Sequence, residues 1–276
     1  MERLKYSLNP NAKIYTEVVA QKWWKLFSED KDIYIHIRKD NYISVYYYGG
    51  SIAKIEYKKG EIIAHINSAY LNERNENGQG YATLLNLREL DATKLESIKA
   101  QIRKEHLKSI EGESTAEKWM QGDLITTHPD EYIDSEFAYY NDTQIGKLRI
   151  DVVRLSNEVL KFVELKCIYN NELRNDETKT DNPAHILEQM NRYANFIAKY
   201  KDDLLRYYQT VCDIRYALGL QNKVEVLSID PNPHLLIFDT YKRYTKRRYT
   251  RIEAIKTLLT TNNIEFEICK SQSTEE

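Results

Sequence analysis

The chain has 276 residues, enough for one large domain or two modest ones, and its 42% hydrophobic and 30% charged residues lie slightly below and slightly above the values typical of soluble globular proteins. Its formal net charge of −2 excludes strong attraction to a polyanion by the overall field, so any contact with nucleic acid must come from a local basic surface. No apolar run is long enough to cross a membrane, the first residues lack the apolar centre of a signal peptide, and the 3 cysteines have no zinc-ligand spacing. We therefore expect a cytoplasmic protein with reduced cysteines.

Residues 1–90 predict a small antiparallel β module of unknown role. Apolar and polar residues alternate through four runs, and the segments KDN, GG and KKG between them are typical of turns. A helix is expected over 16–27, before the first strand. The long polar and aliphatic pattern of residues 91–112 predicts a helical connector. The four expected strands are 32–37, 42–48, 51–57 and 61–66.

Residues 113–270 predict a second, α/β domain, in which strands and helices follow one another along the chain. Its first helix is expected to be capped by Ser114 or Thr115 and to end before Pro129. The tail 271–276 is expected to be disordered. The remaining expected elements are the strands SEFAYYN, GKLRIDVVRL, NEVLKFVELKC, HLLIFD and IEFEIC, two consecutive helices over 183–200 and 201–218, and a basic helix over 242–261.

Three charged side chains stand out in the second domain. Asp151 interrupts an apolar strand, and a short SNE turn leads into FVELKC, where Glu164 and Lys166 share one face of the next strand. Pairing of the two strands as a hairpin brings Asp151 beside these two residues. Two carboxylates at one place repel each other, and a hard divalent cation removes that cost. Asp, Glu and Lys are also the residue types that metal-assisted hydrolysis of a phosphodiester requires.

Asp151 followed by Glu164 and Lys166 at the end of a hairpin resembles the PD-(D/E)XK nuclease superfamily. The preceding segment AEKWMQGDLITTHPDEYIDSEFAYY, with Glu117 and Glu136, is similar to the mismatch and branched-DNA endonuclease branch. The Q-x-x-x-Y pattern of residues 189–193 resembles the helix after the active-site strand in RecB-like members. The resemblance covers about residues 114–198. The sequence departs from the family pattern at residue 150, where Ile replaces Pro, and in the long polar loop over 169–182.

The resemblance implies a restriction-endonuclease-like central mixed sheet flanked by helices, with the smaller antiparallel β module at the N-terminus. It implies a Mg²⁺- or Mn²⁺-dependent (endo)deoxyribonuclease that acts in DNA repair, recombination or antiviral defence. Asp151 and Glu164 would hold the cation with the Leu165 backbone carbonyl, Glu136 would complete the metal site, and Lys166 would position water. Three further residues are assigned to the catalytic site by the same resemblance: Gln189, which holds the lysine or a phosphate, Tyr193, and Glu117, which acts through the outer shell.

Other interpretations of these residues remain open. The charges of the FVELKC strand would also suit a solvated strand face, and a nuclease fold without activity would serve as a module that binds nucleic acid or protein. An RNA-directed nuclease of the same fold is a further alternative. Comparison of DNA with RNA substrates separates this last case from the DNA nuclease.

The segment YKRYTKRRYTR, residues 241–251, alternates basic and aromatic side chains. This pattern favours contacts with phosphates and stacking on bases, although a solvated basic helix face or a surface for a protein partner would look similar. The expected partner is DNA, with RNA as the alternative, and no membrane. A homodimer, or a protein partner bound through the N-terminal module, stays open. The candidate nucleic-acid-binding residues are Lys242, Arg243, Lys246, Arg247, Arg248 and Arg251.

Overall fold

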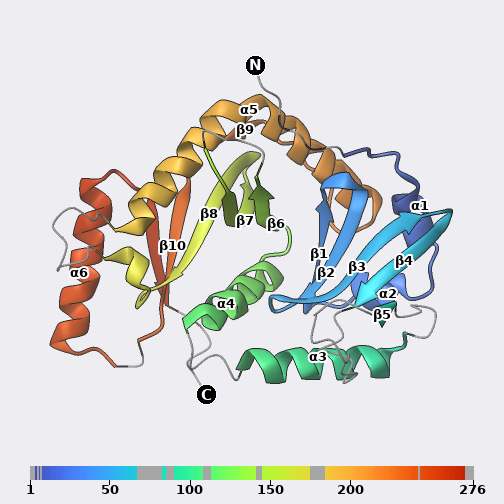
Figure 1. The fold of residues 1–276 in the computed structure, drawn as a ribbon, viewed down its shortest axis with the longest axis horizontal. Coiled ribbons are helices and arrows are strands. Elements are labelled where there is room, and N and C mark those ends of the chain that lie inside the picture. Colours follow the sequence, from blue (N-terminus) through green and yellow to red (C-terminus); the bar gives the residue numbers. More distant parts are fainter. Residues whose placement is uncertain are drawn as a thin grey trace. The chain divides into compact units, whose positions relative to one another are not determined.

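The computed structural model is a mixed α/β protein with two compact units (Figure 1). The N-terminal unit comprises Leu4–Ile133 and Arg206–Val226, and the C-terminal unit comprises Asp134–Leu205 and Leu227–Glu276. We expected the second domain to start at residue 113, but the unit that holds Asp151 and Glu164 starts at Asp134. The structure describes residues 4, 6, 8–66, 83–84, 90–107, 113–140, 145–174, 184–241 and 243–270; the tail 271–276 lies outside them.

The N-terminal unit contains an antiparallel sheet with the strand order β1-β2-β3-β4-β5 among the described residues. All four strands expected from the alternation are present, and Tyr48, Gly49, Lys59 and Gly60 in the turns between them have the positive φ angles of tight hairpins. The short β5 was not expected. The strand bounds are β1 Ile33–Arg38, β2 Tyr42–Tyr47, β3 Gly50–Lys58, β4 Glu61–Ile66 and β5 Thr83–Leu84.

The helices of this unit differ from the expectation in two places. Two helices, α1 Lys13–Val19 and α2 Trp24–Ser28, replace the single helix 16–27. The break allows the consecutive residues Trp23 and Trp24 both to be buried, although adjacent residues of one helix point about 100° apart. After α3 Ala92–Leu107, α4 Glu113–Thr127 begins before its expected caps Ser114 and Thr115.

The C-terminal unit is built on a mixed sheet of six strands among the described residues, in the order β11-β10-β8-β7-β6, with β9 paired to β8. β7 and β8 form an antiparallel hairpin whose two turn residues, Asn157 and Glu158, both have positive φ. β8, β10 and β11 run parallel, which requires the helical crossovers α5 and α6 between them. The strand bounds are β6 Tyr132–Tyr139, β7 Leu148–Ser156, β8 Val159–Cys167, β9 Ser228–Ile229, β10 His234–Asp239 and β11 Phe266–Lys270.

Two helices complete the C-terminal unit. Helix α5 His185–Ala217 joins the two expected helices through a kink at Tyr200, where φ is −115° and ψ is 17°, and its last turns belong to the N-terminal unit. Helix α6 Lys246–Thr261 begins after the expected residue 242 because the side chain of Thr245 caps it, accepting a hydrogen bond from the Arg248 amide. Ile252, Ile255 and Leu259 form its buried stripe.

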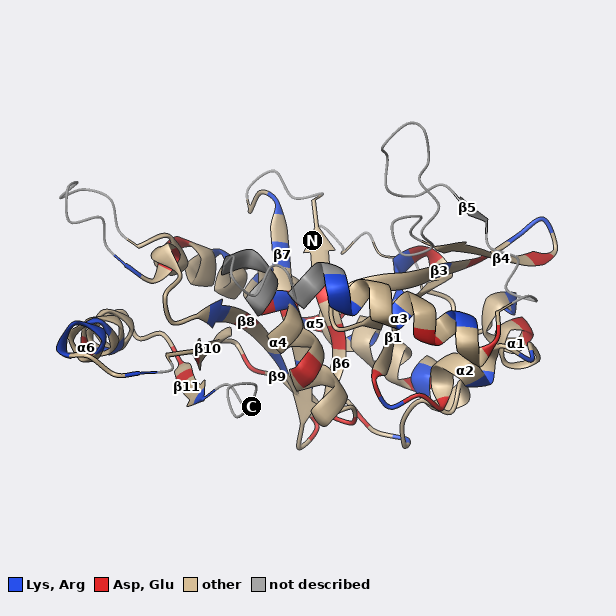
Figure 2. Ribbon diagram, turned by 90° about the horizontal axis from the view of Figure 1, so that it is seen from below, with Lys and Arg blue, Asp and Glu red and all other residues tan. Residues whose placement is uncertain are grey.

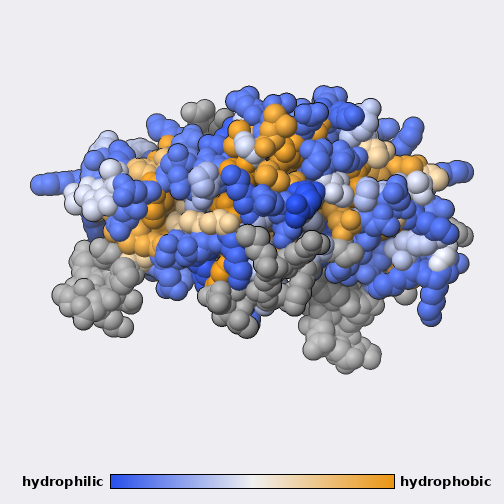
Figure 3. Space-filling model, turned by 90° about the horizontal axis from the view of Figure 1, so that it is seen from above, coloured by the Kyte–Doolittle hydropathy of each residue, from blue (hydrophilic) through white to orange (hydrophobic). Residues whose placement is uncertain are grey.

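No helix in the described part of the chain is long and apolar enough to cross a bilayer. The face of the molecule drawn in Figure 3 is largely hydrophilic, with groups of hydrophobic side chains between the polar ones.

Candidate active site

The candidate site lies where β7 and β8 stop pairing. Their ladder ends at Val152 and Val163, one residue before Asp151 and Glu164 would face each other. Beyond that point the Leu165 amide donates a hydrogen bond to Asp151 Oδ2 over 2.9 Å, so a carboxylate replaces the backbone acceptor of the neighbouring strand. The N–H and C=O groups of one strand residue point to the same side, so the Leu165 carbonyl is directed towards β7 as well.

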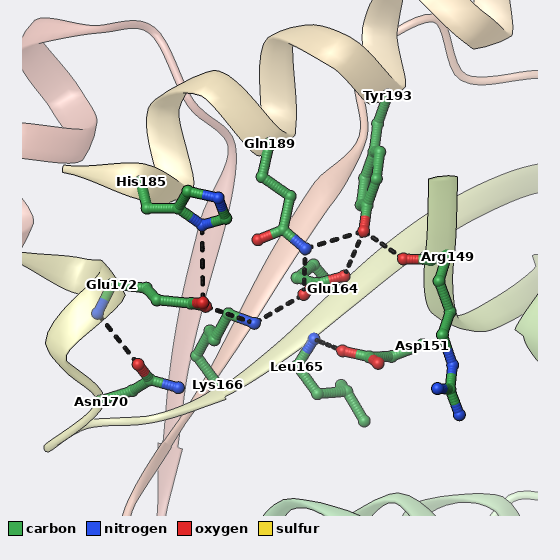
Figure 4. A network of polar contacts seen from close by, with 10 residues as sticks. All are labelled: Arg149, Asp151, Glu164, Leu165, Lys166, Asn170, Glu172, His185, Gln189 and Tyr193. Carbon is green, nitrogen blue, oxygen red and sulfur yellow. Dashed lines mark hydrogen bonds and ion pairs between the residues drawn. The ribbon is translucent and has the colours of Figure 1, made fainter. Parts of the chain in front are cut away.

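Glu164 is the centre of the polar network (Figure 4). Its Oε1 accepts hydrogen bonds from Lys166 Nζ over 2.7 Å and from Gln189 Nε2 over 2.6 Å, while its Oε2 accepts one from the Tyr193 hydroxyl over 3.0 Å. Only 2% of Glu164 and 7% of Lys166 are exposed, because β8 lies inside the sheet between β7 and β10 and α5 contacts this face. This burial excludes the solvated strand face as an interpretation of these two charges.

The surroundings of the two carboxyl groups, Asp151 and Glu164, disfavour their charged forms. Burial raises the pKa of Glu164, although the Lys166 ammonium and the hydroxyl and amide donors from α5 partly offset it. Burial and repulsion by Glu164 raise the pKa of Asp151 well above its usual range, against the opposing effects of the Leu165 amide and Lys166. Without a further positive charge, the site therefore favours a protonated carboxyl group over two carboxylates.

Lys166 lies between two carboxylates. Its Nζ is 2.7 Å from Glu164 Oε1 and 3.0 Å from Glu172 Oε2. Burial alone would lower the pKa of Lys166, but the attraction and the hydrogen bond of Glu164 outweigh burial and raise it. Lys166 thus remains an ammonium group at neutral pH. It can orient a substrate or stabilise negative charge, but it cannot accept a proton.

Gln189 and Tyr193 lie one turn apart on α5 and both point at Glu164. Gln189 Nε2 also donates to the Tyr193 hydroxyl over 2.8 Å, and that hydroxyl contacts the Arg149 carbonyl of β7. Gln189 Oε1 is buried and finds no hydrogen-bond partner among the described residues. The structure therefore brings both helix residues of the Q-x-x-x-Y pattern to the strand pair and leaves one acceptor available there.

Glu136 lies on β6, and its charge is close enough to raise the pKa of Asp151. The side chain pairs with Arg149 through both Nε and Nη2 of the guanidinium. Its backbone φ is 56°, a left-handed conformation that a non-glycine residue within a strand rarely adopts and that costs about 1–2 kcal/mol. The fold thus keeps a strained residue beside Asp151, with its carboxylate engaged by an arginine.

The other expected site residue, Glu117, lies on α4, which belongs to the N-terminal unit. Of the expected nucleic-acid-binding residues, Arg243, Lys246 and Arg247 are exposed, whereas Arg248 and Arg251 are half-buried. Lys242 lies outside the described residues. Figure 2 shows the Lys and Arg residues gathered at α6.

The sequence analysis missed Glu172, the second carboxylate on Lys166. It lies in the polar loop after β8, on a short 3-10 turn over Asn171–Leu173, where Asn170 Oδ1 accepts a hydrogen bond from the Glu172 amide over 2.9 Å. Glu172 Oε1 also lies 3.5 Å from His185 Nδ1 at the start of α5. The signal that would have found it is the Asn two residues before Glu, which is typical of an Asx turn that fixes the following residue.

The donor set of the site fits a hard cation. No group of three or more His, Cys, Asp and Glu side chains in the described part of the chain is arranged to hold a metal ion. Mg²⁺, however, commonly uses one or two carboxylates and completes its shell with water. Asp151, Glu164 and the Leu165 carbonyl supply oxygen donors only, and a cation bound there would favour the charged carboxylates, whose pKa values burial raises.

No family model matches the sequence, and no curated protein or solved structure matches it significantly.

Proposed function

We propose that the protein is a Mg²⁺- or Mn²⁺-dependent nuclease that hydrolyses DNA phosphodiester bonds at the site formed by Asp151, Glu164 and Lys166. The observation that carries this proposal is the placement of the half-buried Asp151 carboxyl group beside the buried Glu164 and Lys166 pair, where β7 and β8 stop pairing. A purely structural ion pair needs one carboxylate for one lysine. Here the second carboxylate, Asp151, adds charge that costs stability, as is typical of functional sites.

The topology of the C-terminal unit is consistent with the restriction-endonuclease-like arrangement that we propose for it. The hairpin of β7 and β8 supplies the charged residues. The parallel strand β10 pairs with the other edge of β8, and helix α5 packs on the face of β8 that carries Glu164. One residue of β8 and two residues of α5 therefore converge on a single carboxylate, Glu164, and Asp151 of β7 accepts a hydrogen bond from the next residue along the strand, Leu165.

Each residue has a distinct task in this proposal. Asp151 and Glu164 would hold the cation, which when bound acidifies a water molecule and shields the phosphate charge. The Lys166 ammonium stabilises the charge that develops on the phosphate oxygens, because it stays protonated at neutral pH. Gln189 and Tyr193 hold the Glu164 carboxylate in one orientation, and the buried Gln189 Oε1 accepts a hydrogen bond from water at the site.

A cleavage assay on a panel of substrates tests this proposal. Wild-type protein is incubated with linear, circular, branched and single-stranded DNA, and with RNA of the same sequence, in Mg²⁺, Mn²⁺ or EDTA. We expect metal-dependent cutting of DNA that Lys166→Ala abolishes and that Lys161→Ala retains. Lys161 is the matched control, because it lies on the same strand and pairs with Asp230 at 3.3 Å outside the network. Cutting of RNA alone would favour the RNA nuclease, and no cutting with retained DNA binding would favour a silent binding module.

A further inference from the structure

The segment that leads into α6 has a composition unlike the rest of the chain. Residues 241–251 contain 6 of the 40 Lys and Arg residues and 3 tyrosines, and no Asp or Glu. The same segment lies in the C-terminal unit with the candidate active site. A local concentration of this kind, in a chain whose net charge is −2, favours a locally basic surface at this segment.

Two tyrosine rings of this segment form an exposed platform. The rings of Tyr244 and Tyr249 stack with centroids 5.3 Å apart and planes 30° apart, and the two residues are 37% and 57% exposed. The Tyr244 hydroxyl donates to the Asp239 carboxylate at the end of β10, and the Tyr249 amide donates to the Thr245 carbonyl in the first turn of α6. The hydroxyl bond holds the Tyr244 ring, and the Tyr249 ring rests against it, so fewer rotamers are lost when a flat partner stacks on the pair.

The cations beside this platform lie at the N-terminal end of α6, where positive charge destabilises a helix. Lys246, Arg247 and Arg248 occupy the first turn of α6, which contains no acidic residue. The N-terminal end of a helix is electropositive, so each cation there is unfavourable by a few tenths of a kcal/mol or more. Arg248 is turned onto the Tyr241 ring, 4.7 Å from its centroid, while Lys246 and Arg247 stay exposed. Cations in the first turn lower the stability of the helix, but they favour binding of an anionic ligand.

A chain of contacts connects this segment to the catalytic lysine. Arg251 donates a hydrogen bond to the Asn170 carbonyl over 3.2 Å, and Asn170 caps the turn that carries Glu172. Glu172 in turn pairs with Lys166 over 3.0 Å. The segment therefore abuts the loop that positions Lys166, and a strand bound along α6 is held next to the site rather than at a remote surface.

We infer that Tyr244 and Tyr249 stack on unpaired nucleobases while Lys246 and Arg247 contact the flanking phosphates, so that the protein binds DNA containing a single-stranded segment. Stacking on a side chain requires a base face that a continuous duplex hides, whereas every unpaired base offers one. A duplex would use the cations alone. That the bound DNA is the substrate rests on the proposed nuclease function; the binding itself does not.

Fluorescence anisotropy in EDTA tests the inference without any catalysis. A labelled 20-nucleotide single strand and the matching duplex are titrated with wild type, Tyr249→Ala and Tyr249→Phe. We expect the single strand to bind more tightly than the duplex, Tyr249→Ala to weaken single-strand binding about tenfold with little change for the duplex, and Tyr249→Phe to bind as wild type does. Lys246→Ala combined with Arg247→Ala is expected to weaken both substrates and to make the salt dependence of binding shallower by about 1.5.

Several results would overturn the inference. The inference is wrong if wild type binds single strand and duplex with equal affinity, or if Tyr249→Ala leaves single-strand binding unchanged. It is also wrong if wild type binds RNA more tightly than DNA of the same sequence. The two proposals fail separately. Single-strand binding that depends on the Tyr249 ring, without cleavage in Mg²⁺ or Mn²⁺, would contradict the nuclease and support the inference. Cleavage and binding that Tyr249→Ala both leaves unchanged would support the nuclease and contradict the inference.

Discussion

Asp151→Asn and Glu164→Gln each remove one negative charge from the same site, yet we expect them to change the stability of the fold in opposite directions. Asn at position 151 can still accept the hydrogen bond that the Leu165 amide donates over 2.9 Å. It also removes a charge that burial and Glu164 disfavour, as the raised pKa of Asp151 shows. Gln at position 164 instead removes the carboxylate that lies 2.7 Å from Lys166 Nζ.

The magnitudes follow from these partners. Breaking a buried ion pair costs about 3–5 kcal/mol, and because Glu172 stays 3.0 Å from Lys166 we expect Glu164→Gln to cost about 3 kcal/mol. For Asp151→Asn, two like charges repel by about 4 kcal/mol at 4 Å and an effective dielectric of 20 and by less at larger separations, so we use about 3 kcal/mol for the repulsion between Asp151 and Glu164. Loss of the charge-assisted amide bond and of the attraction to Lys166 offsets about 2 kcal/mol of this, so the net gain is about 1 kcal/mol.

The gain from Asp151→Asn depends on pH in a defined direction. The folded-state pKa of Asp151 is raised, so the folded state holds its proton more tightly than the unfolded state does. The cost of the charged carboxylate is therefore absent below the unfolded pKa and grows as pH rises through the folded pKa. The Asp151→Asn variant should be more stable than wild type at pH 8 and lose that advantage near pH 4.

Thermal and urea unfolding in EDTA measure both variants. One kcal/mol corresponds to about 2 °C for a chain of this length, so we expect Asp151→Asn to raise the melting temperature by about 2 °C and Glu164→Gln to lower it by about 6 °C. Glu253→Gln is the control, because its carboxylate pairs with Lys256 at an exposed position and contributes little. The reasoning is refuted if Asp151→Asn destabilises the protein at pH 8 as Glu164→Gln does.

Three further measurements follow from the same site. Mg²⁺ or Mn²⁺ at ten times its dissociation constant should stabilise wild type by about 1.4 kcal/mol. We expect the cation to raise the melting temperature of wild type but not that of Asp151→Asn, and an equal rise in both proteins would show that the cation binds elsewhere. Tyr193→Phe should cost about 1–2 kcal/mol in urea unfolding, because Glu164 and Gln189 each lose a buried hydrogen-bond partner; no loss would mean that the hydroxyl is not held there. Glu136→Gly should be more stable than Glu136→Ala by about 1 kcal/mol, because both lose the carboxylate but only glycine adopts a φ of 56° without strain; equal stability would contradict the left-handed backbone.

The sequence predicted the sheet elements of the site because their signals are local. Alternation along FVELKC predicted that Glu164 and Lys166 share one face. The short turn before this strand predicted a hairpin, and a hairpin places Asp151 beside Glu164, one position beyond the last paired residues Val152 and Val163. The four-residue spacing of Gln189 and Tyr193 likewise fixed a shared helix face. These relations depend on neighbouring residues, so no tertiary information was needed.

The parts that were not predicted depend on tertiary contacts. Glu172 lies in a polar loop without periodicity, and only the fold brings its carboxylate to Lys166. The partner of Glu136 is Arg149 on the adjacent strand β7, and nothing in the sequence distinguishes that pair from a surface charge. Glu117 was assigned to the site by its order in the chain, and its helix α4 belongs to the N-terminal unit; its role at the site stays a prediction.

The central claim is that the carboxylate pair at the end of β7 and β8 is a catalytic metal site. Its most direct test is the rate of DNA cleavage by wild type and by Asp151→Asn, a variant expected to fold at least as stably, in Mg²⁺, Mn²⁺ and EDTA. We predict cleavage by wild type that requires the metal and falls at least about a hundredfold in the folded variant. Cleavage at the wild-type rate by Asp151→Asn, or a folded wild type that cuts none of the DNA substrates with either metal, would contradict it.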